Sequence, residues 1–230
     1  MKSIAIIPAR GGSKRIPRKN IKCFLGKPII AYSIQAALES GLFDEVMVST
    51  DDPEIAAVAK QYGATVPFMR SSDNADDYAT TAAVITEVLQ NYAAQGTQFD
   101  VGCCIYPTAP LIKLSALSEG YQQLQTQNFD TVFPVLKYSY PIWRSLKMEA
   151  GKVALNWPEH LNSRSQDLPA AYHDAGQFYW FRTDRFLSSQ KLFTDNSGAV
   201  ELEELEVQDV DNETDWKLAE LKYKLIHRLA

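Results

Sequence analysis

The feature that most constrains the fold is an alternation of short apolar runs with longer amphipathic segments. The runs "SIAIIPA", "EVMVST", "DVGCCIYPTAP" and "DTVFPVL" have the length of strands, and the segments between them, such as "KPIIAYSIQAALESG", have the period of helices. Such an alternation is typical of an α/β fold with a mostly parallel sheet and crossover helices. Because 230 residues with 46% hydrophobic content suit one substantial core better than two, we predict a single domain over residues 1–230.

One stretch breaks this alternation, between about residues 137 and 174. It contains aromatic, proline and polar residues without a helical period, and Trp143 and Trp157 stand near Pro141 and Pro158. These residues indicate extended segments and turns. We interpret the stretch as an arm or lid inserted into the sheet, whose exposed aromatic side chains make a subunit contact. The alternative is an ordinary β-meander packed on its own domain.

Charge and composition argue against several function classes. The formal net charge is −5, which disfavours a general binder of nucleic acids or other polyanions. We find neither a secretory leader nor a run of about 20 apolar residues, so we expect a cytoplasmic protein that is not attached to a membrane. The cysteines Cys23, Cys103 and Cys104 have no C-x-x-C spacing, and we expect them to be reduced packing residues.

The basic loop, residues 9–20, follows the first predicted strand and reads "ARGGSKRIPRKN". Loops that follow the strands of an open α/β sheet meet at its carboxyl edge, where ligands bind. Gly11 and Gly12 allow unusual backbone conformations and the close approach of an anion. The spacing fits neither a Walker A loop nor a dinucleotide fingerprint. We therefore predict a triphosphate site; the alternative is a solvated basic turn or a nucleic-acid patch. The cations of the loop are Arg10, Lys14, Arg15, Arg18 and Lys19.

Two aspartates near the end of the sequence, Asp209 and Asp211, stand two positions apart in "VQDVDN". The segment has the pattern of a strand end, where side chains at i and i+2 share a face. Both carboxylates can then reach one cation. Hard oxygen donors that are few in number suit Mg²⁺, which takes the rest of its shell from water and substrate phosphates. The alternative for Asp211 is a cap of the final helix, which we expect from about Glu213.

Four segments together resemble one known family. "IPARGGSKRIPRKN", "STDDPEIAAVA", "YPTAPL" and "DVDNETDW" are similar, in this order, to the CMP-acylneuraminate synthetases, which activate nonulosonic acids with CTP. The resemblance covers nearly the whole chain. It implies a Rossmann-like nucleotidyltransferase domain, a homodimer whose arm reaches toward the neighbouring site, and a Mg²⁺-dependent reaction. In that reaction the anomeric hydroxyl of a 2-keto sugar acid attacks the α-phosphorus of CTP, and pyrophosphate leaves.

Within this family, Arg15 and the segment "HDAGQFYWF" look most like the pseudaminic acid cytidylyltransferases. The resemblance therefore implies CTP and pseudaminic acid as substrates, for the glycosylation of cell-surface glycans or flagellin. Alternatives that keep the reaction have N-acetylneuraminate, legionaminate or a deoxyoctulosonate as the sugar. Alternatives from another class are a GT-A-like glycosyltransferase, which also uses a D-x-D pair, and a noncatalytic nucleotide-binding protein.

The family's roles can be carried onto this sequence residue by residue. The resemblance implies catalytic roles for Arg10, Lys19 and Asp211, and metal binding by Asp209 and Asp211. Tyr106 replaces a glutamine of the family's motif, so we expect any contact there to come from a phenol hydroxyl. The implied nucleotide-binding residues are Ala9, Arg10, Gly11, Gly12, Ser13, Lys19, Asn20, Arg70 and Tyr106. The implied sugar-binding residues are Lys137, His173, Asp174 and Gln177.

The aromatic run from Phe178 to Phe181 needs no ligand to explain it. If the run forms a strand, Phe178 and Trp180 face one side of the sheet. Tyr179 and Phe181 then face the other side. We therefore expect all four side chains to be core residues, without a catalytic role.

Overall fold

The strands predicted from the apolar runs form one sheet in the computed structural model, which describes residues 1–76 and 78–229. The strand order is β11-β6-β10-β5-β1-β4, and β9 pairs with β6. The strands of this sheet are β1 (Ser3–Pro8), β4 (Glu45–Ser49), β5 (Val101–Ile105), β6 (Thr131–Lys137), β9 (Tyr172–Asp174), β10 (Phe178–Arg182) and β11 (Ser197–Leu202). Two short hairpins lie outside it, β2 (Cys23–Phe24) with β3 (Lys27–Pro28), and β7 (Leu146–Glu149) with β8 (Lys152–Leu155).

The sheet is mixed but mostly parallel. β1 is parallel to both β4 and β5, and β6 is parallel to β11. β10 runs antiparallel between β5 and β6, and β9 is antiparallel to β6. Parallel neighbours need a crossover, usually a helix. Because no α-helix lies between β6 and β10, the chain returns from the interrupted stretch in the opposite direction.

The described residues form six α-helices, and local signals mark some of their ends. Asp52 caps α2 by accepting hydrogen bonds from the backbone N–H groups of Glu54 and Ile55, with Pro53 in the first turn. Gly41 ends α1 with a φ of 64°. The helices are α1 (Ile29–Ser40), α2 (Pro53–Gln61), α3 (Thr81–Ala94), α4 (Leu114–Thr126), α5 (Thr183–Ser189) and α6 (Glu213–His227). The 3-10 helices are η1 (Lys19–Ile21), η2 (Ser72–Asn74), η3 (Ile142–Arg144), η4 (Pro158–His160), η5 (Ser165–Asp167) and η6 (Glu204–Glu206).

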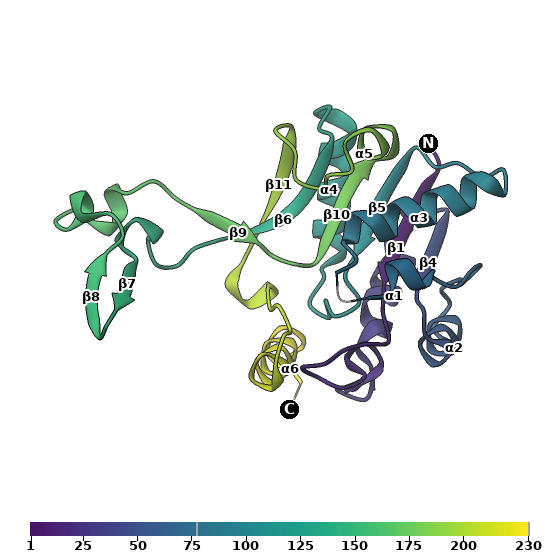
Figure 1. Ribbon diagram of the computed structural model, residues 1–230, viewed down its shortest axis with the longest axis horizontal. Coiled ribbons are helices and arrows are strands. Elements are labelled where there is room, and N and C mark those ends of the chain that lie inside the picture. The colour runs from purple at the N-terminus through teal and green to yellow at the C-terminus, as the bar shows by residue number, and fades with distance from the viewer. Residues whose placement is uncertain (77, 230) are drawn as a thin grey trace.

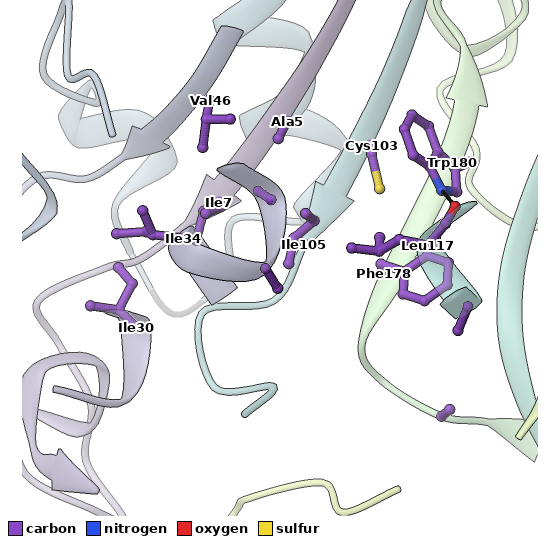
Figure 2. Close-up of a cluster of buried hydrophobic side chains, with 14 of the residues drawn as sticks. Ala5, Ile7, Ile30, Ile34, Val46, Cys103, Ile105, Leu117, Phe178 and Trp180 are labelled. Carbon is purple, nitrogen blue, oxygen red and sulfur yellow. Dashed lines mark hydrogen bonds between the residues drawn. The ribbon is translucent and has the colours of Figure 1, made fainter. Parts of the chain in front are cut away.

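The central strand β10 supplies core side chains to both faces of the sheet. Phe178 and Trp180 pack in the same cluster as α1 and α4, and the Trp180 indole N–H donates to the Leu117 carbonyl at 3.1 Å (Figure 2). Tyr179 and Phe181 pack on the opposite face with α3 and α5. The sequence-based assignment of the aromatic run to the core is therefore confirmed.

The interrupted stretch forms an arm that projects from the sheet (Figure 1). β6 leads into it, β9 returns beside β6, and the β7–β8 hairpin lies at its far end. Apolar side chains of this hairpin are exposed, with Leu146 at 61% and Met148 at 75% of their full accessible surface. The arm is thus not a meander packed on its own domain. Its role as a subunit contact stays a prediction.

The last part of the chain packs on the basic loop. Ile16 of that loop and Trp216 of α6 belong to one apolar cluster with Val210, which stands between the two aspartates and is fully buried. The prediction that "VQDVDN" ends a strand is wrong. Residues 207–211 lie between η6 and α6, outside the sheet. Val207 is buried in the core cluster to which α1 and α4 contribute, and Val210 is buried beside Trp216 of α6, so both are buried without strand pairing. Among the described residues, no helix has the length and apolar character needed to cross a membrane.

Candidate active site

A cavity of about 710 Å³ opens at the carboxyl edge of the sheet, beyond the ends of β1 and β5. The residues that line it are far apart in the sequence and include members of the basic loop as well as Asp209 and Asp211. This is the edge at which the open α/β topology places ligands. The predicted site residues that line the cavity are Arg10, Ser13, Lys19, Asn20, Arg70, Tyr106, Asp209 and Asp211.

The basic loop is held in shape by its own side chains. Asn20 is buried, and its amide donates to the Arg10 carbonyl at 2.9 Å, which ties the two ends of the loop together. Arg18 adopts a left-handed conformation with a φ of 56° and turns away from the cavity. Its guanidinium pairs with the carboxylates of Asp52 and Glu54 at the start of α2. Arg18 is therefore a structural residue, while the other four cations of the loop line the cavity.

Gly11 of the loop is required for a different reason from the one expected, whereas a side chain on Gly12 would meet open space. Neither Gly11 nor Gly12 has a positive φ. A Cβ on Gly11 would lie 2.8 Å from an oxygen of Asp52, so close approach to α2 excludes a side chain there. The Gly11 N–H donates to Asp51 at 2.9 Å, and Ala9 is fully buried. Ala9, Gly11 and Gly12 do not line the cavity, and their contact with a nucleotide stays a prediction.

Opposite the basic loop, Asp209 and Asp211 present their carboxylates to the cavity. Arg15 donates to Asp211 Oδ1 at 2.7 Å, and the Lys19 ammonium lies 3.9 Å from the same oxygen. Although Asp209 as a whole is exposed, the cavity walls partly withdraw its carboxyl group from water, which raises its pKa, and repulsion by Asp211 adds to this effect. A cation placed between the two carboxylates would relieve that repulsion.

Lys19 joins the two halves of the site. Its ammonium donates to the Val210 carbonyl at 2.7 Å, between the two aspartates. Burial lowers the pKa of Lys19, and the charges of Asp211 and Asp209 act in the opposite direction. An ammonium that has lost part of its water interacts more strongly with an anion that enters the cavity. Lys19 is thus placed to contact both a phosphate group and the backbone that carries the carboxylates.

The donor set fits Mg²⁺. Among the residues that the structure describes, no three His, Cys, Asp or Glu side chains gather as a closed metal site. The protein therefore supplies two carboxylates, Asp209 and Asp211, beside a cavity large enough for a nucleotide. Mg²⁺ is commonly held by one or two carboxylates, with water and substrate phosphates completing its shell. The open arrangement of oxygen donors matches that preference.

The other wall of the cavity carries an arginine, the start of a helix and a phenol. Arg70 is 8% exposed, and its guanidinium donates to both the hydroxyl and the carbonyl of Ser49 at the end of β4. Thr81 opens α3, so the positive end of that helix dipole faces the cavity. Tyr106 follows β5, and burial raises the pKa of its phenol, which keeps it a neutral hydrogen-bonding group.

The predicted sugar residues are divided between two places. Asp174 accepts hydrogen bonds from the Tyr179 hydroxyl and, at 3.0 Å, from the Gly176 N–H. The side chain of Gln177 is buried, and its amide N–H donates to the Glu206 carbonyl at 2.5 Å. Lys137 lines a separate cavity of about 280 Å³ at the base of the arm. The His173 ring lies 4.9 Å from the Tyr138 ring, between centroids, in the same part of the arm, and the two ring planes are tilted by 56°.

None of these four side chains lines the main cavity of this chain. Gly176 nevertheless lies beside Asp209, since a Cβ added to it would be 4.0 Å from the Asp209 carboxyl carbon. The "HDAGQ" segment therefore borders the acidic end of the site. The sugar contacts proposed for its residues stay predictions.

Sequence reasoning missed several cavity residues that make no charged signal. Pro107 and Thr108 line the cavity and belong to the "YPTAPL" segment, so the motif itself could have identified them. Thr81 and Val84, one turn apart at the start of α3, line it too. Their contribution depends on the packing of α3 over the sheet, which the sequence pattern does not specify.

Comparisons with known proteins identify one family. The cytidylyltransferase family model matches residues 4–222. A pseudaminic acid cytidylyltransferase of Campylobacter jejuni is 43% identical over 231 residues, which cover the whole of both chains. A CMP-N,N'-diacetyllegionaminic acid synthase of Legionella pneumophila is 32% identical over 96% of this chain and 95% of its own.

The fold has a counterpart among solved structures. The structure of a CMP:2-keto-3-deoxy-manno-octonic acid synthetase complexed with CTP has a TM-score of 0.70 at 18% identity, with both chains fully covered. This likeness concerns the fold. The family matches confirm the resemblance that the basic loop and the paired aspartates indicated. The chain therefore belongs to the cytidylyltransferase family and is a nucleotidyltransferase.

Proposed function

We propose that this chain is a Mg²⁺-dependent pseudaminic acid cytidylyltransferase, which converts CTP and pseudaminic acid into CMP-pseudaminic acid and pyrophosphate. The observation that carries the proposal is the 43% identity to a pseudaminic acid cytidylyltransferase over the full length of both chains. The cavity supports it, because four cations of the basic loop and two carboxylates meet there. That combination suits a triphosphate with a divalent cation.

The reaction needs groups that stabilise charge rather than a covalent nucleophile. The anomeric hydroxyl gives up its proton to water as its oxygen attacks the α-phosphorus, the bond from that phosphorus to the bridging oxygen breaks, and pyrophosphate leaves. Arg10, Ser13 and Lys19 would donate to the phosphate oxygens on which negative charge accumulates. Asp209 and Asp211 would hold Mg²⁺, which when bound neutralises phosphate charge and lowers the pKa of a coordinated hydroxyl.

The sugar is the part of the proposal with a real competitor. The Legionella pneumophila enzyme makes CMP-N,N'-diacetyllegionaminic acid and matches 96% of this chain at 32% identity. Its lower identity favours pseudaminic acid for this chain. The glycosyltransferase reading has no comparable support, because the cytidylyltransferase family model extends over residues 4–222.

The test is pyrophosphate release by the purified protein with CTP and Mg²⁺. Parallel reactions contain pseudaminic acid, N,N'-diacetyllegionaminic acid, N-acetylneuraminic acid or no sugar. We expect release with pseudaminic acid at a kcat/KM at least about tenfold above that for the other sugars, corresponding to roughly 1.4 kcal/mol of discrimination. Preferential release with another sugar acid would keep the reaction and overturn the substrate. Absence of release with all of them would overturn the function.

We also propose that the protein is a cytoplasmic homodimer joined through the arm, with no nucleic-acid partner. The support for the dimer is the arm itself, which projects from the sheet and exposes apolar side chains at its far end. Exposed apolar patches on projecting elements commonly mark protein interfaces.

A further inference from the structure

The acidic segment, residues 204–211, carries both carboxylates of the site and lies outside the sheet. Backbone carbonyl groups that leave a sheet still need hydrogen-bond donors. In this segment several are supplied by side chains from separate elements. Lys19 of the basic loop donates to the Val210 carbonyl, and Gln177, just before β10, donates to the Glu206 carbonyl. Lys222 of α6 donates to two more, the carbonyls of Glu204 and Val207.

Lys222 binds two carbonyl groups near the beginning of the acidic segment. Its ammonium donates to the Val207 carbonyl at 2.7 Å and to the Glu204 carbonyl at 2.9 Å. The side chain is only 16% exposed, and the Glu204 carboxylate is 3.8 Å away. Hydrogen bonds from a charged donor to a partly buried acceptor are stronger than neutral ones. One side chain thus fixes η6 and the following residue against α6.

The acidic segment is therefore held at both ends. At the far end, Val210 is fully buried in the cluster that contains Ile16 and Trp216, and Lys19 binds its carbonyl. At the near end, Lys222 and Gln177 hold the backbone. Asp209 lies between the two anchors, so the direction of its carboxylate depends on both. Loosening one anchor should impair the site without abolishing the fold.

We propose that Lys222 is a positioning residue, which holds the backbone so that Asp209 and Asp211 face the cavity together. The inference rests on the proposed function, in which these carboxylates hold Mg²⁺. Lys222 does not line the cavity and acts only through the backbone of the acidic segment. Lys222 makes its hydrogen bonds to the acidic segment and not to the basic loop. Loss of the Lys222 side chain should therefore change the metal requirement and kcat more than the KM for CTP.

The test compares Lys222→Met, which keeps the length of the side chain and removes the charge, with Lys222→Arg, which keeps the charge and the donors. Lys217→Met is the matched control, since Lys217 is an exposed lysine on the same helix. Mn²⁺ affinity is measured by electron paramagnetic resonance with CTP and no sugar acid, so that no turnover occurs. Amide hydrogen exchange of residues 207–211 is measured in the metal-free proteins.

We expect Lys222→Met to weaken Mn²⁺ binding and to speed exchange of residues 207–211, each by roughly tenfold, as for other residues that orient metal ligands. Lys222→Arg should restore most of both properties, and Lys217→Met should change neither. If Lys222→Met does not fold, Lys222→Gln, which keeps one donor group, replaces it in the same measurements.

Two results would overturn the proposal in distinguishable ways. A lower melting temperature with unchanged Mn²⁺ affinity and unchanged exchange of residues 207–211 would reduce Lys222 to a residue of general stability. If exchange becomes faster while Mn²⁺ affinity is unchanged, Mn²⁺ binding by the Asp209→Asn variant decides between two explanations. If that variant weakens Mn²⁺ binding, Lys222 holds the backbone without positioning the metal ligands. If it does not, the metal assignment of the proposed function fails.

Discussion

At the scale of single residues, Asp211 shows how the site balances its charges. Its carboxylate accepts a hydrogen bond from Arg15 at 2.7 Å and lies 3.9 Å from the Lys19 ammonium. The cations that suit a triphosphate therefore also compensate the carboxylates before any ligand binds. Replacing either aspartate changes the charge of the site by one unit while leaving its shape nearly unchanged.

We expect Asp209→Asn and Asp211→Asn to lower kcat by at least roughly a hundredfold, because transition-state charge stabilisation of this kind is worth about two to three orders of magnitude per group. The melting temperature should stay close to that of the wild type. Turnover is measured by pyrophosphate release at saturating CTP and Mg²⁺, with Asp195→Asn, an exposed aspartate, as control. Near-normal turnover in either variant would remove that aspartate from the metal site.

The sequence predicted which residues belong to the site better than it predicted where their side chains point. Lys19, Arg70 and the two aspartates were assigned from their segments, and all of them line the cavity. Arg18 looked equivalent to its neighbours in the basic loop, yet it turns to Asp52. That partner is 34 positions away, and only the packing of α2 against the loop brings it close.

At the scale of secondary structure elements, the pair between Arg18 and Asp52 joins the basic loop to the start of α2. The Arg18 guanidinium, together with hydrogen bonds from backbone N–H groups of α2, lowers the pKa of Asp52 from 3.8 to about 2. The carboxylate thus acts both as the helix cap and as the attachment point of the loop.

Asp52→Asn separates these two roles, because an asparagine oxygen can still cap the helix. We expect it to lower the free energy of unfolding at pH 7 by about 1 to 2 kcal/mol, a range reduced for the partial exposure of Arg18. The folded-state pKa lies below the unfolded value, so this stabilisation is complete above about pH 4 and disappears as the pH falls toward 2. The difference between wild type and variant should therefore shrink over that window.

Urea unfolding at pH 7, 5, 4 and 3 measures this difference directly. Asp73→Asn is a suitable control, since Asp73 is exposed in η2. A difference that stays constant down to pH 3 would show that the variant disturbs the cap or the packing rather than an ionic interaction.

Elements were predictable where their signals are local. The alternation within the aromatic run predicted the two faces of β10, and Gly41 and Pro53 stand where such residues commonly end and start a helix. The sequence did not predict that β10 runs antiparallel to β6. That direction follows because the arm, and not a crossover helix, connects the two strands. Residues 207–211 were expected to end a strand, whereas Val207 and Val210 are buried in two different clusters and pair with no strand.

At the scale of the whole molecule, the arm stands out because it projects away from the sheet (Figure 1). Leu146 and Met148 lie on one face of the β7–β8 hairpin, and Val153 is paired opposite Met148. All three are more than half exposed. An apolar face of this kind is expected to be covered by a second copy of the chain.

We expect the double variant Leu146→Asp with Met148→Asp to be a monomer under conditions in which the wild type is a dimer, because both copies would bring like charges into the contact. Sedimentation velocity measures the mass. The control is Lys147→Ser, whose side chain points to the opposite face of the same strand. A wild-type protein that sediments as a monomer at micromolar concentration would contradict the arm-mediated dimer.

The packing of α6 on the basic loop has a consequence for synthesis on the ribosome. The cations of the basic loop follow the first strand, whereas the segment that carries the two carboxylates packs against a helix that ends at His227. A nascent chain can therefore fold most of its sheet and still lack the acidic half of its site. The acidic half of the site forms only after α6 has left the exit tunnel and docked on the basic loop, so we expect turnover to require that step.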